Sequence, residues 1–153
     1  MSGLLGNERE LLARMIQAEA GNQGELGMRA VASVMDNRRR AKGYGGNTFT
    51  DVLLAPGQFS PANSITGYAG GQQGVDLNRL QPSQTAYKIT DAVMSGNYED
   101  PTGGALNFLN PDISQPSWLS SMQNTVRIGD HLFGTAGSGE GVAGRPGGTQ
   151  MAR

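Results

Sequence analysis

The chain has 153 residues and a formal net charge of −1, so one domain with its own hydrophobic core is expected. A charge this close to zero gives no long-range attraction to nucleic acid, which excludes a dedicated nucleic-acid-binding module. The absence of cysteine and the single histidine, His131, exclude cysteine nucleophiles, iron–sulfur clusters and the histidine-rich zinc sites of hydrolases, so no metal or other cofactor is expected.

Two helices are predicted in the N-terminal part of the chain. Asn7 is placed to cap the first, with Glu10 as its capping-box partner, and Gly21 ends it. The apolar residues between them recur at the three- and four-residue spacing of an amphipathic helix. The second helix covers 25–39, and a basic cluster marks its end: Arg38, Arg39, Arg40 and Lys42. We interpret this cluster as a solvated helix end rather than a phosphate-binding site.

The next part of the chain combines short helical segments with loops. Residues 49–54 form a helical turn, and 55–82 form a long irregular loop rich in Gly, Pro, Asn, Ser and Gln. A loop of this length inside a compact domain is usually functional. A third helix covers 83–95, with Ser83 as its cap and Gly96 as its stop.

Short strands follow these helices. One is predicted around 105–109 and another over 126–133, where Gly129 marks a point at which the strand can break. Together they indicate a hairpin or small sheet packed beside three helices. The domain is predicted to cover 1–134, and 135–153 form a glycine-rich tail.

Glu19 stands apart from the other glutamates. It lies three residues after Ile16 and seven after Leu12, so helical geometry places it on the apolar face of the first helix. It also lies near the C-terminal end of that helix, where the dipole disfavours negative charge. Both effects raise the pKa of its carboxyl group, which suits a general acid for glycosidic cleavage. The alternative is a structural carboxylate bonded to an arginine or to the backbone.

For the other candidate residues, a structural role is more common than a functional one. His131 lies near the end of the last strand, and no G-x-S-x-G motif supplies a serine for it to activate, so we interpret it as structural. The aromatic rings that could stack on sugars are more often used for packing. They are Phe59, Tyr68, Phe108 and Trp118.

Four blocks of sequence occur in an order typical of one family. The first spans 12–21 and 27–38 and contains an A-E-A segment around Glu19. The others are P-G-Q-F-S at 56–60, D-P-T-G-G-A-L-N-F-L-N-P at 100–111 and I-G-D-H-L-F at 128–133. Together they extend over about residues 10–134. The set resembles the SleB-type cell-wall hydrolases, which are spore cortex-lytic enzymes and their relatives in bacteria and phages.

This resemblance implies an α+β domain that is similar to lysozyme and to transglycosylase domains, with three main helices and a small β-hairpin. It implies peptidoglycan glycan strands as the substrate. The catalytic glutamate of the family falls on Glu19. The Q-F-S loop and the G-A-x-x-F-x-N segment line the family's cleft, which implies substrate-binding roles for five residues: Gln58, Phe59, Asn107, Phe108 and Asn110. Residues 62–78 and the tail do not fit the family pattern.

The mechanism depends on whether Glu19 has a carboxylate partner. A retaining or inverting glycosidase needs a second carboxylate, and no acidic residue stands out in that role. We therefore expect a lytic transglycosylase, which needs one acid that also serves as base. The alternatives are a muramidase, with Asp76, Asp100 or Asp112 as the second carboxylate, and a non-catalytic, wall-docking component of a phage virion.

The expected location follows from the termini and from hydropathy. No basic segment precedes an apolar one at the N-terminus, so no Sec-type signal peptide is expected, and no apolar stretch is long enough to span a bilayer. A phage virion protein, or a lysin released by a holin into the periplasm and cell wall, meets these conditions. Residues 135–153 bury too little apolar surface to offset backbone ordering, so we expect them to contribute little to stability. We expect the tail to attach the domain to phage tail or capsid proteins.

Overall fold

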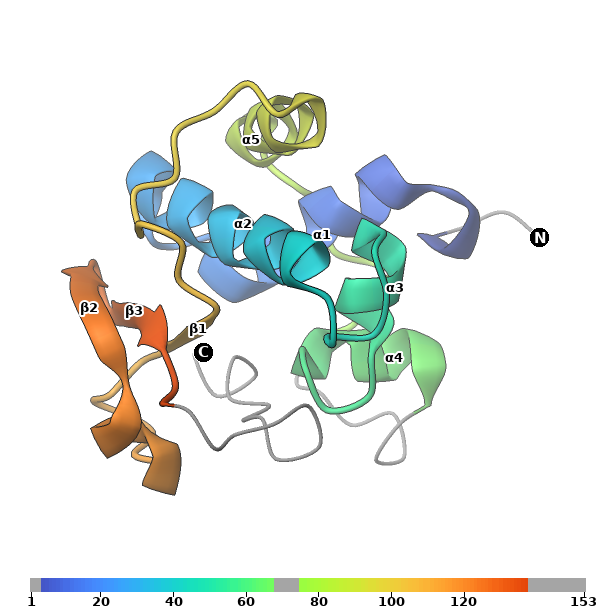
Figure 1. The fold of residues 1–153 in the computed structure, drawn as a ribbon. Helices are drawn as coiled ribbons and strands as arrows, with labels where there is room; N and C mark the ends of the chain where they lie inside the picture. The colour runs from blue at the N-terminus through green and yellow to red at the C-terminus, as the bar shows by residue number, and fades with distance from the viewer. Residues whose placement is uncertain (1–3, 68–74, 138–153) are drawn as a thin grey trace.

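The computed structural model describes residues 4–67 and 75–137 and places their helices beside a small sheet (Figure 1). The α-helices in these ranges are α1 (Glu8–Ala20), α2 (Gly24–Ala41), α3 (Phe49–Leu54), α4 (Asn63–Thr66) and α5 (Gln84–Ser95). Short 3-10 helices cover Leu4–Gly6, Ser60–Ala62 and Ser117–Ser121. Strands β1 (Asn107–Leu109), β2 (Gln123–Ile128) and β3 (His131–Thr135) form an antiparallel sheet in the order β1–β3–β2.

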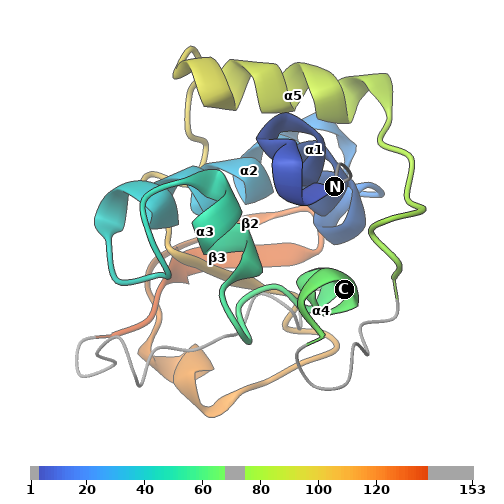
Figure 2. The same ribbon diagram turned by 90° about the vertical axis from the view of Figure 1, so that its right-hand side faces the viewer.

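The helix α2 joins the two parts of the fold, because it packs on the other helices and on the sheet. It contacts α1, α3 and α5 as well as the strands β1 and β2. Figure 2 shows α5 on the side of α1 and α2 that lies away from the sheet. Apolar residues of α1 and α2 are fully buried at the predicted helical spacing, among them Leu12, Ile16, Val31 and Met35. The predicted α+β class is confirmed.

One of the two hydrogen bonds of the predicted capping box at the start of α1 is confirmed. Asn7 Oδ1 accepts from the Glu10 amide at 3.0 Å. The amide of Asn7 donates to the Leu4 carbonyl at 3.2 Å, so it is already used and the reciprocal capping-box bond does not form. The Glu10 carboxylate instead accepts from Arg14 Nε at 2.8 Å and from the Tyr87 hydroxyl at 2.9 Å. It thereby joins α1 to α5.

The prediction for the middle of the chain needs one correction. The helices at 49–54 and 83–95 are confirmed, with Ser83 Oγ accepting from the Ala86 amide at 3.1 Å and Gly96 ending α5 at a φ of 78°. The predicted loop 55–82, however, contains a 3-10 helix and α4 over 60–66. Pro61 favours the first turn of that segment, and the burial of Phe59 in the core fixes where it begins.

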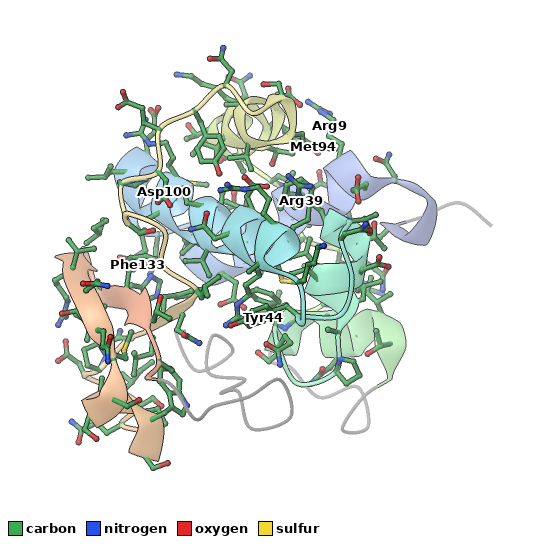
Figure 3. All side chains as sticks on the ribbon, viewed as in Figure 1. Arg9, Arg39, Tyr44, Met94, Asp100 and Phe133 are labelled. Carbon is green, nitrogen blue, oxygen red and sulfur yellow. The ribbon has the colours of Figure 1, made fainter. Side chains whose placement is uncertain are left out.

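The predicted strand over 126–133 is two strands. The chain reverses at Gly129 and Asp130, so β2 and β3 form a hairpin, and β1 pairs with the other edge of β3. Phe133 on the central strand lies opposite Phe108 of β1 and Val126 of β2. Its ring stacks on Phe108 with centroids 5.6 Å apart and lies on the sheet beside α2 (Figure 3).

The interpretation of the basic cluster as a solvated helix end is wrong for Arg38. This side chain is 0% exposed, because it lies on the same inward face of α2 as Val34 and Met35. Its Nε donates to the Leu106 carbonyl and its Nη1 to Gln58 Oε1, both at 2.7 Å. Arg38 therefore holds the segment before β1 and the loop around Gln58 against α2.

Asp100 organises the segment between α5 and β1 (Figure 3). Its carboxylate accepts from the amide and hydroxyl of Thr102, from the Gly104 amide and from Asn37 Nδ2, at distances of 2.6–2.9 Å. Burial raises the pKa of the Asp100 carboxyl, but these donors outweigh the effect and the pKa lies below its ordinary value. Because Asn37 belongs to α2, Asp100 also fastens this segment to the core.

Replacing Asp100 with asparagine should lower the free energy of unfolding by about 1–3 kcal/mol at pH 7, because the charged acceptor of these bonds is lost. The pKa of Asp100 is lowered by folding, so its contribution is present above the unfolded-state pKa of about 3.9. The contribution disappears as the pH falls through the folded-state pKa. Urea unfolding should show a difference between wild type and Asp100→Asn that shrinks below about pH 4. The exposed neighbour Glu99→Gln is the matched control, and a difference that stays constant in acid would contradict the prediction.

Candidate active site

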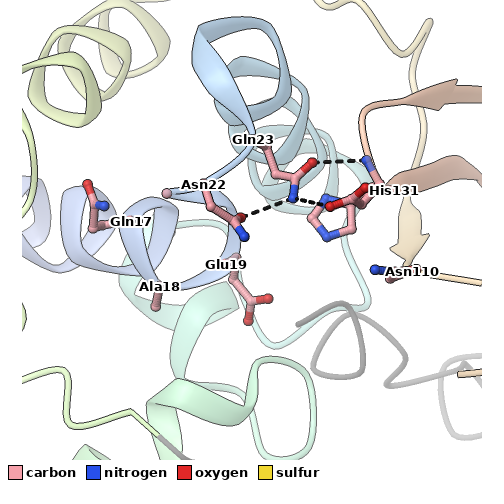
Figure 4. A pocket seen from close by; sticks show the side chains of 9 residues that line it. Gln17, Ala18, Glu19, Asn22, Gln23, Asn110 and His131 are labelled. Atoms are coloured by element: carbon pink, nitrogen blue, oxygen red, sulfur yellow. Dashed lines mark hydrogen bonds between the residues drawn. The ribbon is translucent and has the colours of Figure 1, made fainter. Parts of the chain in front are cut away.

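A cavity of about 450 Å³ lies where the end of α1 meets the β2–β3 hairpin. Its helical wall comes from the last turn of α1 and the turn to α2: Gln17, Ala18, Glu19, Gly21, Asn22 and Gln23. Its sheet wall comes from the residue after β1 and from the hairpin: Asn110, Asp130 and His131. Amides, carboxylates and an imidazole therefore surround a space that is large enough for part of a sugar chain (Figure 4).

Glu19 occupies the position that helical spacing predicts. It is 2% exposed on the last turn of α1, and it lines the cavity beside Ala18 (Figure 4). The neighbouring residues of the same face, Met15 and Ile16, are fully buried in the core. The carboxyl group is thus at the boundary between the apolar core and a polar cavity, which is the environment that a general acid needs.

His131 faces Glu19 from the sheet wall (Figure 4). It is 2% exposed, and its ring packs edge-on against Phe108 and Phe133 at centroid distances of 5.1 and 5.9 Å. The packing on Phe108 and Phe133 agrees with the interpretation of His131 as structural. The same residue also lines the cavity, which that interpretation did not include. Its place beside Glu19 depends on a contact between distant parts of the chain, and no local pattern could have revealed it.

The structure separates the five predicted substrate-binding residues. Asn110 lines the cavity with Glu19, whereas Gln58 does not line it and its Oε1 accepts from Arg38. Phe59 and Phe108 are 1% and 0% exposed and belong to the core, so neither ring presents a face to a sugar. Asn107 is 2% exposed, and its Oδ1 accepts from the Ala136 amide at 2.9 Å.

A second carboxylate lines the cavity, and it is none of the three that were predicted. Asp76 and Asp112 form ion pairs with Arg79 and Arg127, and Asp100 belongs to the turn before β1. None of the three is part of either wall. Asp130, in the hairpin turn, is exposed and lines the sheet wall. The cavity therefore contains two carboxylates, Glu19 and Asp130.

Within residues 4–67 and 75–137, histidine and acidic side chains do not gather in groups of three or more that could hold a metal ion. No helix in the same ranges has both the length and the hydropathy to cross a membrane.

Comparison with curated proteins finds relatives that act on spore or cell walls according to their names. The chain is 33% identical over 133 residues to a spore cortex-lytic enzyme of Bacillus cereus, which is 86% of this chain and 46% of that protein. It is 31% identical to the Bacillus subtilis enzyme. The cell wall hydrolase CwlJ of Halalkalibacterium halodurans is 28% identical, over 81% of this chain and 82% of the relative. The chain thus spans about half the length of the cortex-lytic relatives.

Solved structures give the same result for the fold. The catalytic domain of the germination-specific lytic transglycosylase SleB from Bacillus anthracis matches with a TM-score of 0.67 and 28% identity, over 84% of this chain and 94% of that domain. The catalytic domain of Bacillus cereus SleB matches with a TM-score of 0.64 and 31% identity, over 84% and 89%. These matches confirm the predicted lysozyme-like α+β fold.

A family model described as Cell Wall Hydrolase matches residues 22–134. The match includes the whole sheet wall of the cavity and begins just after Glu19. It covers most of the chain, and it agrees with the four sequence blocks and with the fold. The chain therefore belongs to the cell wall hydrolase family.

Proposed function

We propose that this domain cleaves the glycan strand of peptidoglycan as a lytic transglycosylase, with Glu19 as its acid and base. The observation that carries the proposal is the buried Glu19 carboxyl at the wall of a polar cavity of about 450 Å³. The similar domain from Bacillus anthracis is described as a lytic transglycosylase, which supports the same reaction type here.

The reaction requires a proton to move twice at Glu19. Its carboxyl group first donates a proton to the oxygen of the glycosidic bond, and the bond between that oxygen and C1 of the muramoyl sugar breaks. The carboxylate then takes the proton of the 6-hydroxyl of the same sugar, whose oxygen attacks C1. The products are a 1,6-anhydro end and a free hydroxyl on the departing sugar. Glu19 is protonated again, and no water is consumed.

Polar groups across the cavity are placed to hold the sugar during these steps. We propose that the Asn110 amide and the His131 imidazole hydrogen-bond to it from the sheet wall. Gln58 and Asn107 line neither wall of the cavity, so the substrate-binding roles predicted for them stay predictions. We do not assign Phe59 and Phe108 a role at the sugar, because both are core residues.

Digestion of purified sacculi should release fragments that end in 1,6-anhydromuramic acid. The physical reason is that the 6-hydroxyl replaces water as the attacking group, so the product is one water molecule lighter than a hydrolytic one. Mass spectrometry of the unreduced fragments measures this difference directly. Fragments that carry only reducing muramic acid would refute the transglycosylase assignment.

A hydrolytic muramidase is the second candidate, and the position of Asp130 is the observation that favours it. A second carboxylate on the opposite wall is what a hydrolytic glycosidase uses to activate water or to attack C1. In that case the fragments would carry reducing ends, and Asp130→Asn would lose activity to the same extent as Glu19→Gln.

We propose the cell wall as the place of action. The predicted attachment to phage tail or capsid proteins concerns the tail, of which 138–153 lie outside the described residues. Within the described part, β3 ends at Thr135, and the amides of Ala136 and Gly137 donate to Asn107 and Ser121. We therefore propose that the catalytic domain extends to Gly137, slightly beyond the predicted boundary.

A further inference from the structure

The side chain of Gln23 joins the turn between α1 and α2 to the β2–β3 hairpin (Figure 4). Its Nε2 donates to Asp130 Oδ2 at 3.0 Å, and its Oε1 accepts from the Asp130 amide at 2.9 Å. The other hydrogen of Nε2 goes to Asn22 Oδ1 at 3.0 Å. Both donors and the acceptor of this amide are therefore in use, and two of the three bonds are made to Asp130.

Two glycines enclose the Gln23 side chain. A Cβ at Gly129 would lie 2.5 Å from Gln23 Oε1, and a Cβ at Gly27 would lie 2.6 Å from Gln23 Cβ. Either distance is too short for a stable contact, so a larger residue at either position would displace Gln23. Gly129 also has a φ of 60°, a conformation that residues with side chains rarely adopt. Glycine at both positions therefore leaves the space that the Gln23 side chain occupies.

The Gln23–Asp130 pair lies between the two walls of the cavity. Both residues line it, with Glu19 four residues before Gln23, at the end of α1, and His131 directly after Asp130. The walls belong to different elements, and the described packing of the sheet on the helices is made mainly through α2. The pair is therefore a direct connection between the segment that carries Glu19 and the segment that carries His131.

We propose that Gln23 and Asp130 are positioning residues for cleavage, and that their pairing fixes the sheet wall at the distance from Glu19 that the glycan strand needs. This inference rests on the proposed function. An acid must lie within hydrogen-bond reach of the glycosidic oxygen, and a displacement of about 1 Å lowers a rate by as much as about 100-fold. Neither side chain has to touch the reacting atoms to have this effect.

An exchange of the two functional groups tests the proposal. In Gln23→Glu two carboxylates face each other, and kcat on purified sacculi should fall about ten-fold or more. In Asp130→Asn an amide oxygen still accepts from Gln23, so the loss should be smaller, about three-fold. The double variant Gln23→Glu/Asp130→Asn restores the two hydrogen bonds between residues 23 and 130, because the side chain of residue 130 is now the donor. It should recover most of the activity lost in Gln23→Glu. Gln84→Glu, an exposed site at the start of α5, is the matched control for the charge change.

The outcomes separate the alternatives. Full activity of Gln23→Glu, or a lower Tm with an unchanged kcat, would show that the pair is merely structural and would overturn the proposal. Loss of activity in Asp130→Asn without recovery in the double variant would overturn it too, because Asp130 would then act on the substrate itself. A wild-type chain that cleaves no glycan would refute the proposed function, and this result is visible before any variant is made.

Discussion

The Glu19→Gln variant should lose peptidoglycan cleavage by roughly 10²–10⁴-fold or more while keeping its fold. Glutamine retains the volume and the polarity of the side chain, so the last turn of α1 has no reason to change. An amide cannot donate a proton to the leaving oxygen and then take one from the 6-hydroxyl. The rate is measured as the release of soluble fragments from purified sacculi, and the fold is checked by Tm and circular dichroism.

Glu25→Gln is the matched control for this variant. Glu25 lies in the first turn of α2, half exposed, and its carboxylate faces Lys88 at 3.6 Å rather than the cavity. It should cleave at the wild-type rate. Turnover near the wild-type value by Glu19→Gln would refute the assignment of Glu19 as the acid and base. Asp130 would then be the next candidate, because it is the other carboxylate that lines the cavity.

Arg38→Met should lower the free energy of unfolding by about 3–6 kcal/mol, since two hydrogen bonds made by a charged group are each worth about 1.5–3 kcal/mol. Methionine fills part of the space but leaves the Leu106 carbonyl and Gln58 Oε1 without their donor. The guanidinium also lies 5.1 and 5.3 Å from the ring centroids of Tyr44 and Phe59, and these contacts disappear as well.

Urea unfolding followed by circular dichroism measures this loss. Arg79→Met is the control, because the Arg79 side chain is 88% exposed and forms an ion pair with Asp76 at 3.7 Å. It should change stability by less than about 1 kcal/mol. If Arg38→Met were as stable as this control, the contacts of the buried Arg38 would contribute nothing to the free energy of unfolding.

The helices could be predicted from the sequence because their signals are local. Asn7 and Ser83 cap the helices that follow them through bonds to the third residue on, and Gly96 ends α5 in a left-handed conformation. The burial of Glu19 could be predicted for the same reason, since it follows from spacing along one helix.

Features that depend on contacts between distant segments could not be predicted. A run of arginines looks the same in sequence whether its first member faces water or the core, and only the packing of α2 against Gln58 and Leu106 shows that Arg38 is inside. The aromatic residues Phe59 and Phe108 were equally ambiguous, and the structure places both in the core. Asp130 and His131 join Glu19 only because the hairpin folds onto the end of α1.

The order of the strands has a consequence for the point during synthesis at which the cavity can be completed. Gln23 and Asp130 are 107 positions apart, and β3 must be present before either β1 or β2 can pair. Synthesis delivers the N-terminal segment first, and contacts of such long separation form slowly. A nascent or prematurely terminated polypeptide therefore carries Glu19 without the wall that faces it. If the proposed function holds, a chain that stops before β3 should therefore cleave no glycan, because Asp130 and His131 are then not held opposite Glu19.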